Sequence, residues 1–414
     1  MSKLNPVVAA TAAVATIMVV ALCVAVVGTA SPASADSLCV SSYPSPSFYT
    51  SIQAAIAAAG DGDLIKIYQG TYTETLVITE DITLQGGWSQ KCTTRLTEDP
   101  QFTVVDGGAA GSVISISSGS TVTLDGLTVT NGHAQKGGGL HVSGASATLN
   151  NMLVTGNVIS PTGSSYAQWA YGGGVYVYEA TVNLTNCELS HNTSDPHSSD
   201  ICFGGGLALE SEALDPAVAF LENTYIVSNS NPSHSDPGGS TLYGSGLYLD
   251  PQSQVSFQGT DNLIAYNESR AGGGVYMYGD VDLEGVMISD NFASRDGGGI
   301  FIASGFEGGR ISNNYLLRNK SGHNGDSIMA SDVDLEIANN TVVGHSSSSG
   351  AGIEVMDTGN GVAELVNNIV VNHAIGIKRS DNGAADMTLS HNDVWNNTTN
   401  YQNCLLYTSP SPRD

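Results

Sequence analysis

The most regular feature of this sequence is a short hydrophobic pattern that returns many times. A glycine cluster is followed by an apolar residue, a variable residue and a second apolar residue. The copies are Gly137 to Val142, Gly172 to Val177, Gly204 to Leu209, Gly244 to Leu249, Gly272 to Met277 and Gly297 to Ile302. The alternation is that of a strand with its two aliphatic residues on one side. Each copy is too short to bury its own apolar side, so the copies must stack as coils of a solenoid.

A second apolar pair lies downstream in each copy and ends in asparagine. The asparagines are Asn157, Asn192, Asn229, Asn291, Asn319 and Asn397. Asparagine tolerates the left-handed backbone conformation and bonds to nearby backbone. We therefore expect equivalent asparagines to stack as a structural ladder at one corner of the coil.

The chain before the repeats has a different pattern. Residues 50–60 begin with a hydroxyl residue, place Ile52, Ile56 and Ala59 on one face and end in glycine. This is typical of a short amphipathic helix, which would cover the open end of the solenoid, where unpaired strand edges favour aggregation. Residues 61–72 and 76–87 then form the first strands.

These features together resemble a known family. The helix, the run Gly62 to Ile67, the triplet Gly70 to Tyr72, the strand Ile82 to Gly86 and the glycine and asparagine repeats cover roughly residues 45–403. They resemble the secreted right-handed parallel β-helix proteins of the pectate-lyase-like superfamily, and bacterial surface proteins with repeats of the polymorphic-outer-membrane type. The expected fold is all-β: one right-handed parallel β-helix of three parallel sheets with a short N-terminal capping helix. Lyases, hydrolases, adhesins and non-enzymes share this architecture, so it implies no particular activity.

The two ends of the chain predict processing and export. Lys3, the apolar run from Val7 to Val27 and Ala33-Ser34-Ala35 have the order of a secretory signal. The apolar run is also long enough to span a bilayer, so an uncleaved anchor is the alternative. The tail from Cys404 onward breaks the repeat and resembles translated adapter sequence, which leaves the true C-terminus open.

The expected organisation is a signal peptide at 1–35, a cap with the first coils at 36–100, the β-helix at 101–403 and a foreign tail at 404–414. We expect a secreted or cell-surface monomer with no membrane span after signal cleavage.

Charge and cysteine content narrow the partners. The formal net charge is −26, and removal of residues 1–35 with Lys3 makes it −27, which excludes nucleic acid as a favoured partner. An exported protein permits disulfides, and we expect Cys39 to pair with Cys92 and Cys187 with Cys202.

The irregular coils are the expected place for a binding site. Successive third glycines at 139, 174, 206 and 246 are 35, 32 and 40 residues apart, whereas the next two steps are 28 and 25 residues. The extra chain falls mainly in three loops, 158–171, 193–203 and 230–243, and the first of them contains Trp169. Long loops on a rigid scaffold often carry function.

Beside these loops lies a column of outward aromatic residues, Tyr176, Tyr248, Tyr276 and Phe301. An open column would stack against sugar rings. In the alternative interpretation, the loops fold over the column and the rings only pack against them.

Basic residues are scarce, so their positions are informative. Arg270 and Arg295 each lie four residues before the third glycine of their coil, with His323 at the corresponding place in the next coil. They form a candidate site for an acidic glycan. Neutralisation by Glu268, Asp290 and Asp296 is the alternative that we favour.

A second column contains Asp282, Arg310, Glu336 and Glu364. In the resembling family, lyases use a basic residue and calcium-binding carboxylates, but a surface salt-bridge ladder fits this column better. The characteristic motifs of those enzymes are absent, so we assign no catalytic residue and expect no cofactor, with Ca²⁺ only for a lyase. The predicted function is binding to extracellular polysaccharide or a structural, adhesive role at the cell surface. The alternative is a carbohydrate-active enzyme, a polysaccharide lyase before a glycoside hydrolase.

Overall fold

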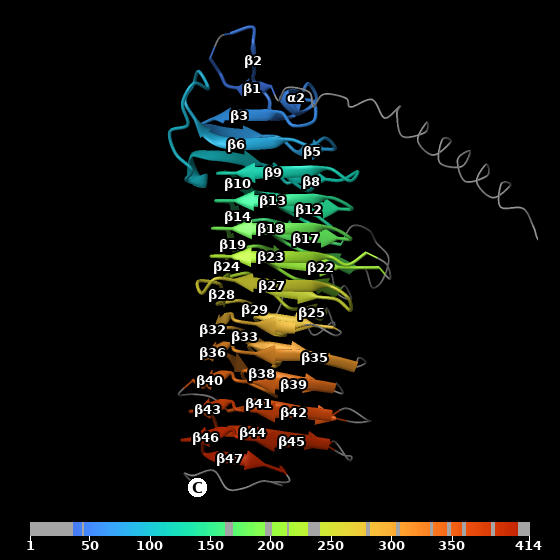
Figure 1. Cartoon of the computed structure of the whole chain (residues 1–414), viewed down its shortest axis with the longest axis vertical. Helices are drawn as coiled ribbons and strands as arrows, with labels where there is room; N and C mark the ends of the chain where they lie inside the picture. The colour runs from blue at the N-terminus through green and yellow to red at the C-terminus, as the bar shows by residue number, and fades with distance from the viewer. Residues whose placement is uncertain are drawn as a thin grey trace, which may run out of the picture. The chain divides into compact units, whose positions relative to one another are not determined.

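The structure is a computed structural model. It describes residues 36–43, 45–161, 169–194, 201–212, 215–230, 241–278, 282–303, 307–331, 334–345, 349–357, 362–381 and 386–404. The chain divides into residues 1–35, which lie outside the described part, and residues 36–414. Within the second unit the strands lie above one another in sequence order, one coil per repeat (Figure 1). The predicted signal peptide and most of the predicted foreign tail fall outside the described residues.

Four groups of strands form the sides of the coil in the described part of the chain, and we name them sheets A to D. Sheet A contains, in sheet order, β2 (Phe48–Tyr49), β1 (Ser37–Val40), β3 (Leu64–Tyr68), β6 (Thr83–Trp88), β9 (Thr121–Asp125), β13 (Ser146–Asn150), β18 (Thr181–Thr185), β23 (Val218–Glu222) and β27 (Gln254–Gln258), and then β31 (Asp282–Glu284), β35 (Glu307–Ser312), β39 (Asp334–Ala338), β42 (Val362–Val366) and β45 (Asp386–Ser390). Sheet B contains β4 (Gly70–Thr73), β7 (Thr103–Asp106), β10 (Thr128–Thr130), β14 (Leu153–Thr155), β19 (Glu188–Ser190), β24 (Tyr225–Val227), β28 (Leu263–Ala265), β32 (Met287–Ser289), β36 (Tyr315–Leu317), β40 (Thr341–Val343), β43 (Ile369–Val371) and β46 (Asp393–Trp395).

Sheet C contains β5 (Leu76–Ile78), β8 (Ile114–Ile116), β12 (Leu140–Ser143), β17 (Val175–Tyr178), β22 (Leu207–Glu210), β26 (Leu247–Leu249), β30 (Val275–Met277), β34 (Ile300–Ile302), β38 (Ile328–Ser331), β41 (Ala351–Asp357), β44 (Ile375–Asp381) and β47 (Thr399–Gln402). Sheet D is the addition that the sequence did not predict. It contains β11 (His133–Ala134), β15 (Val158–Ile159) and β20 (Thr193–Ser194), and then β16 (Trp169–Tyr171), β21 (Ile201–Phe203), β25 (Thr241–Tyr243), β29 (Glu268–Ala271), β33 (Phe292–Asp296) and β37 (Lys320–Ser321).

The glycine-cluster strands are parallel and pair in register from coil to coil. Val175 pairs with Leu207, Leu207 with Leu247, and Leu247 with Val275. The aliphatic residues that follow each glycine cluster point inward, and Val175, Leu207 and Val275 are fully buried in the continuous core. The prediction that these residues line the interior is confirmed.

The predicted asparagine ladder is present at the corner after sheet B. The side-chain Nδ2 of Asn157 donates to Oδ1 of Asn192 at 3.0 Å, and the same bond joins Asn192 to Asn229 at 3.1 Å. Asn267 continues the ladder, although the sequence analysis did not include it. The left-handed residue at this corner is the one before each ladder asparagine, for example His191 with φ 54°. The asparagines therefore stabilise the corner by buried hydrogen bonds, not by their own backbone conformation.

A second interior column lies at the corner between sheets A and B. In the later coils it is another asparagine ladder, in which Asn314 donates to Asn340 at 3.1 Å and Asn340 to Asn368 at 3.1 Å. Earlier coils place Met152 and Cys187 at the same position, each directly before its sheet B strand.

One predicted disulfide is correct and the other is wrong. Cys39 and Cys92 are bonded, with an S–S distance of 2.01 Å. Cys187 and Cys202 are both thiols. Cys187 packs in the main core, whereas Cys202 lies on β21 in a separate cluster with Ile159. Cys187 lies at the corner directly before β19, whereas Cys202 is the middle residue of β21 in sheet D, so the two thiols belong to different parts of the coil.

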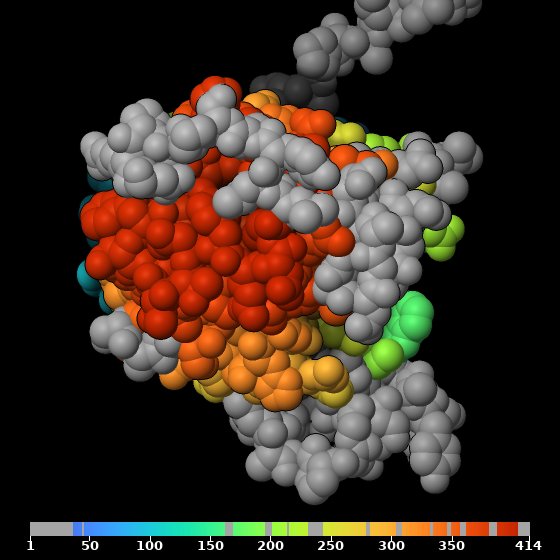
Figure 2. Space-filling view, turned by 90° about the horizontal axis from the view of Figure 1, so that it is seen from below, coloured from blue at the N-terminus to red at the C-terminus, as the bar shows by residue number. Residues whose placement is uncertain are grey.

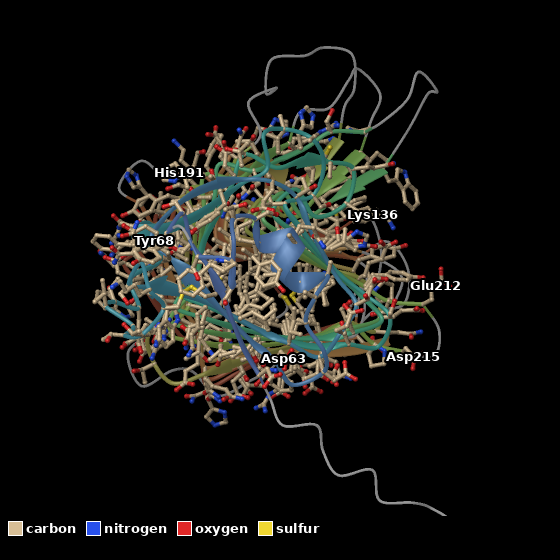
Figure 3. All side chains as sticks on the ribbon, turned by 90° about the horizontal axis from the view of Figure 1, so that it is seen from above. Asp63, Tyr68, Lys136, His191, Glu212 and Asp215 are labelled. Atoms are coloured by element: carbon tan, nitrogen blue, oxygen red, sulfur yellow. A yellow bond between two sulfur atoms is a disulfide. The ribbon has the colours of Figure 1, made fainter. Side chains whose placement is uncertain are left out.

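The capping helix is present but shorter than predicted. Helix α2 spans Ile52–Ile56, and the Ser51 hydroxyl caps it by accepting from the amide of Ala54. Glu74 accepts from the amides of Ile52 and Gln53, which satisfies two more amide groups of the first turn. Viewed from the N-terminal end, α2 lies over the middle of the cross-section (Figure 3).

At the other end, the coloured atoms of the last coils pack side by side across the section (Figure 2).

A 3₁₀ turn at Pro100–Phe102, η1, precedes β7. Among the residues that the structure describes, no helix is long and apolar enough to cross a membrane.

Candidate binding surface

The aromatic column of sheet C is covered, which contradicts the open strip, one of the two interpretations that the sequence left open. Tyr176 is fully buried, Tyr248 is 6% exposed and Tyr276 is 7% exposed. Phe301 is partly buried and stacks on Tyr276 at a centroid distance of 5.2 Å. The alternative interpretation, in which neighbouring chain folds over the column, is therefore the one that the structure supports. Residues 162–168, 195–200 and 231–240 of the three loops lie outside the described part.

Sheet D supplies the cover. Its strands β16, β21 and β25 place Tyr171, Phe203 and Tyr243 in register with one another. Phe203 lies 4.5 Å from Tyr248, and Tyr243 lies 4.5 Å from Tyr276, measured between ring centroids. The ring column of sheet D thus packs against the ring column of sheet C, and together they form a second hydrophobic cluster outside the main core.

A charged group closes one end of this cluster. Lys136 Nζ donates to Tyr176 Oη at 2.8 Å and lies 3.3 Å from Glu210 Oε2, while Tyr176 Oη donates to the same carboxylate oxygen. The ammonium also lies over the ring of Tyr178 at 5.4 Å. Burial, reinforced by Glu210, raises the pKa of Tyr176 well above its usual range, so its hydroxyl remains a donor. The group satisfies a buried phenol at the end of the ring cluster.

The other predicted binding residues, Trp169, Arg270 and Arg295, lie on strands of sheet D. Trp169 is 55% exposed at the edge of sheet D and contacts Phe203 edge to face. Arg295 is exposed and lies 3.8 Å from Asp296, the local neutralisation that we favoured. Arg270 lies on β29, where a bulge interrupts the pairing with β33. Ala271 pairs with Asp296, so Arg270 and Arg295, the residues directly before them, lie on neighbouring coils, whereas Trp169 lies on β16.

The column Asp282, Arg310, Glu336 and Glu364 is in register, as predicted. Arg310 Nε lies 3.2 Å from Glu336 Oε2, and both side chains are about two-fifths exposed, at 43% and 42%. This is the expected geometry of a surface salt bridge. Among the described residues no group of three or more His, Cys, Asp and Glu side chains is placed to hold a metal ion, and the expectation about Ca²⁺ stays untested.

A row of exposed apolar side chains lies on sheet B, which the sequence did not indicate as a binding surface. In each strand from β24 to β46 the middle residue is buried in the core, and alternation places its two neighbours on the outer side of the sheet. Of these neighbours, Ala265, Ser289 and Val371 are nevertheless buried. We call these outward residues the sheet B face: Tyr225, Val227, Leu263, Ala265, Met287, Ser289, Tyr315, Leu317, Thr341, Val343, Ile369, Val371, Asp393 and Trp395. Tyr225, Met287, Tyr315, Ile369 and Trp395 are all at least two-fifths exposed.

This face lies away from the covered column. Sheet B runs between two corners, one after Tyr68 at the end of β3 and one at His191 after β19. Seen from the N-terminal end, Tyr68 and His191 lie on one side of the section, and Lys136 and Glu212 on the other (Figure 3).

Polar side chains border the face at both corners. On one side Asn339 and Asn367, both exposed and in the left-handed conformation, are joined by a bond of 2.6 Å from Nδ2 of Asn367 to Oδ1 of Asn339. On the other side Arg318 donates to Asp290 through Nε at 2.7 Å and Nη2 at 2.6 Å. This pairing raises the pKa of Arg318 above its usual value.

A pattern in the sequence could have revealed this face. A half-buried strand normally alternates apolar and polar residues, whereas β36 reads Tyr-Leu-Leu and β43 reads Ile-Val-Val. Large apolar residues at both outward positions indicate a strand that is either covered by other residues or part of an exposed apolar surface that can bind a ligand.

The fold agrees with comparisons to known proteins. The family described as "Right handed beta helix region" matches residues 216–399. Among solved structures, the surface adhesin PfbA of Streptococcus pneumoniae is 12% identical over 85% of this chain and 88% of its own, with a TM-score of 0.49. The pectin methylesterase of Aspergillus niger is 16% identical over 71% of this chain and 87% of its own, with a TM-score of 0.36. No curated protein matches the sequence.

The described part of the chain therefore has the parallel β-helix fold, and residues 216–399 match the right-handed β-helix family. The sequence identities and TM-scores of these two structures are too low to assign the function of either protein to this chain.

Proposed function

We propose that this protein is a secreted or cell-surface β-helix that binds polysaccharide through the sheet B face. The observation that carries the proposal is the exposure of large apolar side chains at the same outward position on successive coils. Tyr225 is 41% exposed, Tyr315 is 55% exposed and Trp395, in the adjacent outward column, is 48% exposed.

Exposed apolar patches of this extent are rare on soluble proteins unless they bind something. Aromatic rings that lie on a rigid sheet lose little conformational entropy when a flat ligand stacks on them. Successive rungs are about 4.8 Å apart, so the face presents a regular row of contacts to an extended chain. The Cys39–Cys92 disulfide is consistent with an oxidising compartment outside the cytoplasm.

Affinity electrophoresis of the full-length protein in gels that contain soluble polysaccharides tests the proposal. We expect at least one polysaccharide to retard the parent protein. The triple variant Tyr225→Ala, Tyr315→Ala, Trp395→Ala should migrate as in an empty gel. Trp169→Ala is the matched control, because it removes an equally exposed ring from another face and should be retarded like the parent.

Equal retardation of the triple variant and the parent would contradict the assignment to sheet B. Loss of retardation in Trp169→Ala alone would move the site to the loop side of sheet D.

A further inference from the structure

We infer that the sheet B face selects a neutral, extended glycan that lies along the axis of the β-helix, an inference that rests on the proposed function. The steps below concern charge, hydrogen bonding and direction.

The face carries no charge over most of its length. All sheet B strands from β24 to β43 are described, and their outward residues include no Lys, Arg, Asp or Glu. Charged residues appear only at its two ends, with Glu188 on the preceding strand and Asp393 on the last. A carboxylated or sulfated glycan would find no cation beneath it.

The nearest cation at the border is already engaged. Arg318 makes two short bonds to Asp290, so the pair is neutral as a unit. An acidic sugar would have to displace Asp290 from the guanidinium, and would also meet the repulsion of a protein whose formal net charge is −26. Both effects favour a ligand without charge.

The border supplies hydrogen bonds that suit hydroxyl groups. Asn339 and Asn367 on one side, and Asn372 and Asn396 on the other, are exposed amides, and in each pair one member donates to the other. Each amide has both donor and acceptor capacity. A pyranose chain has apolar C–H faces and hydroxyl edges, so its faces would lie on the rings while its edges reach these amides.

The arrangement of the apolar residues sets the direction of the ligand. Tyr225, Met287, Tyr315 and Ile369 occupy one outward column, related by the register of successive strands. A chain that crossed the stack along a strand would cover only two of the outward residues of that coil. A chain that runs from coil to coil contacts the whole column.

Other occupants fit less well. Two copies of the protein would each bring the same negative charge to the contact, which disfavours self-association through this face. A basic protein would match the net charge but not the uncharged surface of the face itself, because ionic contacts need charges at the contact.

The test is a binding panel with the full-length protein at two salt concentrations. The probes are neutral β-glucan, unsubstituted xylan and mannan, with polygalacturonate and a sulfated galactan as acidic counterparts. We expect a neutral probe to bind with an affinity that changes less than twofold between 50 and 500 mM salt, roughly as expected for a contact without ion pairs.

Two variants sharpen the assignment. Asn339→Gly with Asn367→Gly removes the amides from one border but tolerates the positive φ, and should weaken binding of the neutral probe several-fold. Arg318→Gln should leave that binding unchanged.

The outcomes separate the two proposals. Binding only to acidic probes, weakened by salt and lost in Arg318→Gln, would overturn the inference about neutral glycans and leave polysaccharide binding intact. If no probe binds, and sedimentation shows instead self-association that Tyr315→Ala abolishes, polysaccharide binding itself would be overturned.

Discussion

The outward residues of sheets C and B make an instructive comparison. Both sheets carry large apolar side chains, aromatic rings among them, at outward positions, yet Tyr176 is fully buried in sheet C whereas Tyr315 is 55% exposed in sheet B. The difference arises because sheet D packs its own rings, such as Phe203, against sheet C. The same local pattern therefore gives a second hydrophobic core on one side and a candidate binding surface on the other.

The largest expected effect concerns the role of these rings in stability. Tyr248→Ala removes a ring that is 6% exposed and contacts Phe203, so it should lower the free energy of unfolding by about 3–5 kcal/mol. Tyr315→Ala should change it by less than about 0.5 kcal/mol, because the ring is exposed. Urea unfolding followed by circular dichroism measures both values. Equal losses in the two variants would show that the two columns do not differ as described.

The next effect tests burial at the ladder corner. His373 is 3% exposed and neither ring nitrogen has a hydrogen-bond partner among the described residues. Burial lowers the pKa of His373 to about 4, against the opposing effect of Asp326.

Because the folded-state pKa lies below the unfolded value of about 6.5, the stability that neutral His373 provides is fully present above pH 6.5. It is lost as the pH falls toward 4, by roughly 2–3 kcal/mol. His373→Asn should flatten this part of the stability profile measured by urea unfolding. His391→Asn, at an exposed corner, is the control and should leave the profile unchanged. A profile that His373→Asn does not alter would place the pH dependence elsewhere.

The smallest effect concerns the polar end of the covered cluster. Tyr176→Phe keeps the ring but removes the hydroxyl that donates to Glu210 and accepts from Lys136. The free energy of unfolding should fall by about 1.5 kcal/mol, the lower end of the range for hydrogen bonds to charged groups, because Lys136 and Glu210 still pair with each other. Tyr225→Phe on the exposed face should have no measurable effect on unfolding. A loss in Tyr176→Phe as large as that in Tyr248→Ala would show that the hydroxyl, and not ring packing, dominates the cluster.

These comparisons also correct an expectation from the sequence. In an open column, Tyr248 and Tyr276 would point into solvent and contribute little to stability. They do point outward, but into a second cluster. The sequence predicted on which side of their own strand these side chains lie, but not whether that side is exposed to solvent.

Much of the coil follows from the sequence alone. Period-two alternation places Val175 and Val177 on the same side of their strand, and the returning glycine cluster requires successive coils to stack. The asparagine ladder followed from the same repeat. These features depend on local geometry and on a repeat that every coil obeys, so each coil gives the same information again.

The tertiary structure alone determined which outward column is covered and which is exposed. Exposure depends on what packs against a side chain from elsewhere in the chain. In sheet D the aromatic residues Tyr171, Phe203 and Tyr243 each precede a glycine cluster, but their positions in the sequence do not show that these strands fold back over sheet C. For the same reason the sequence could not place Cys187 and Cys202 in different parts of the coil. Alternation along a strand sets the direction of a side chain, but only the neighbouring strands determine whether it reaches solvent.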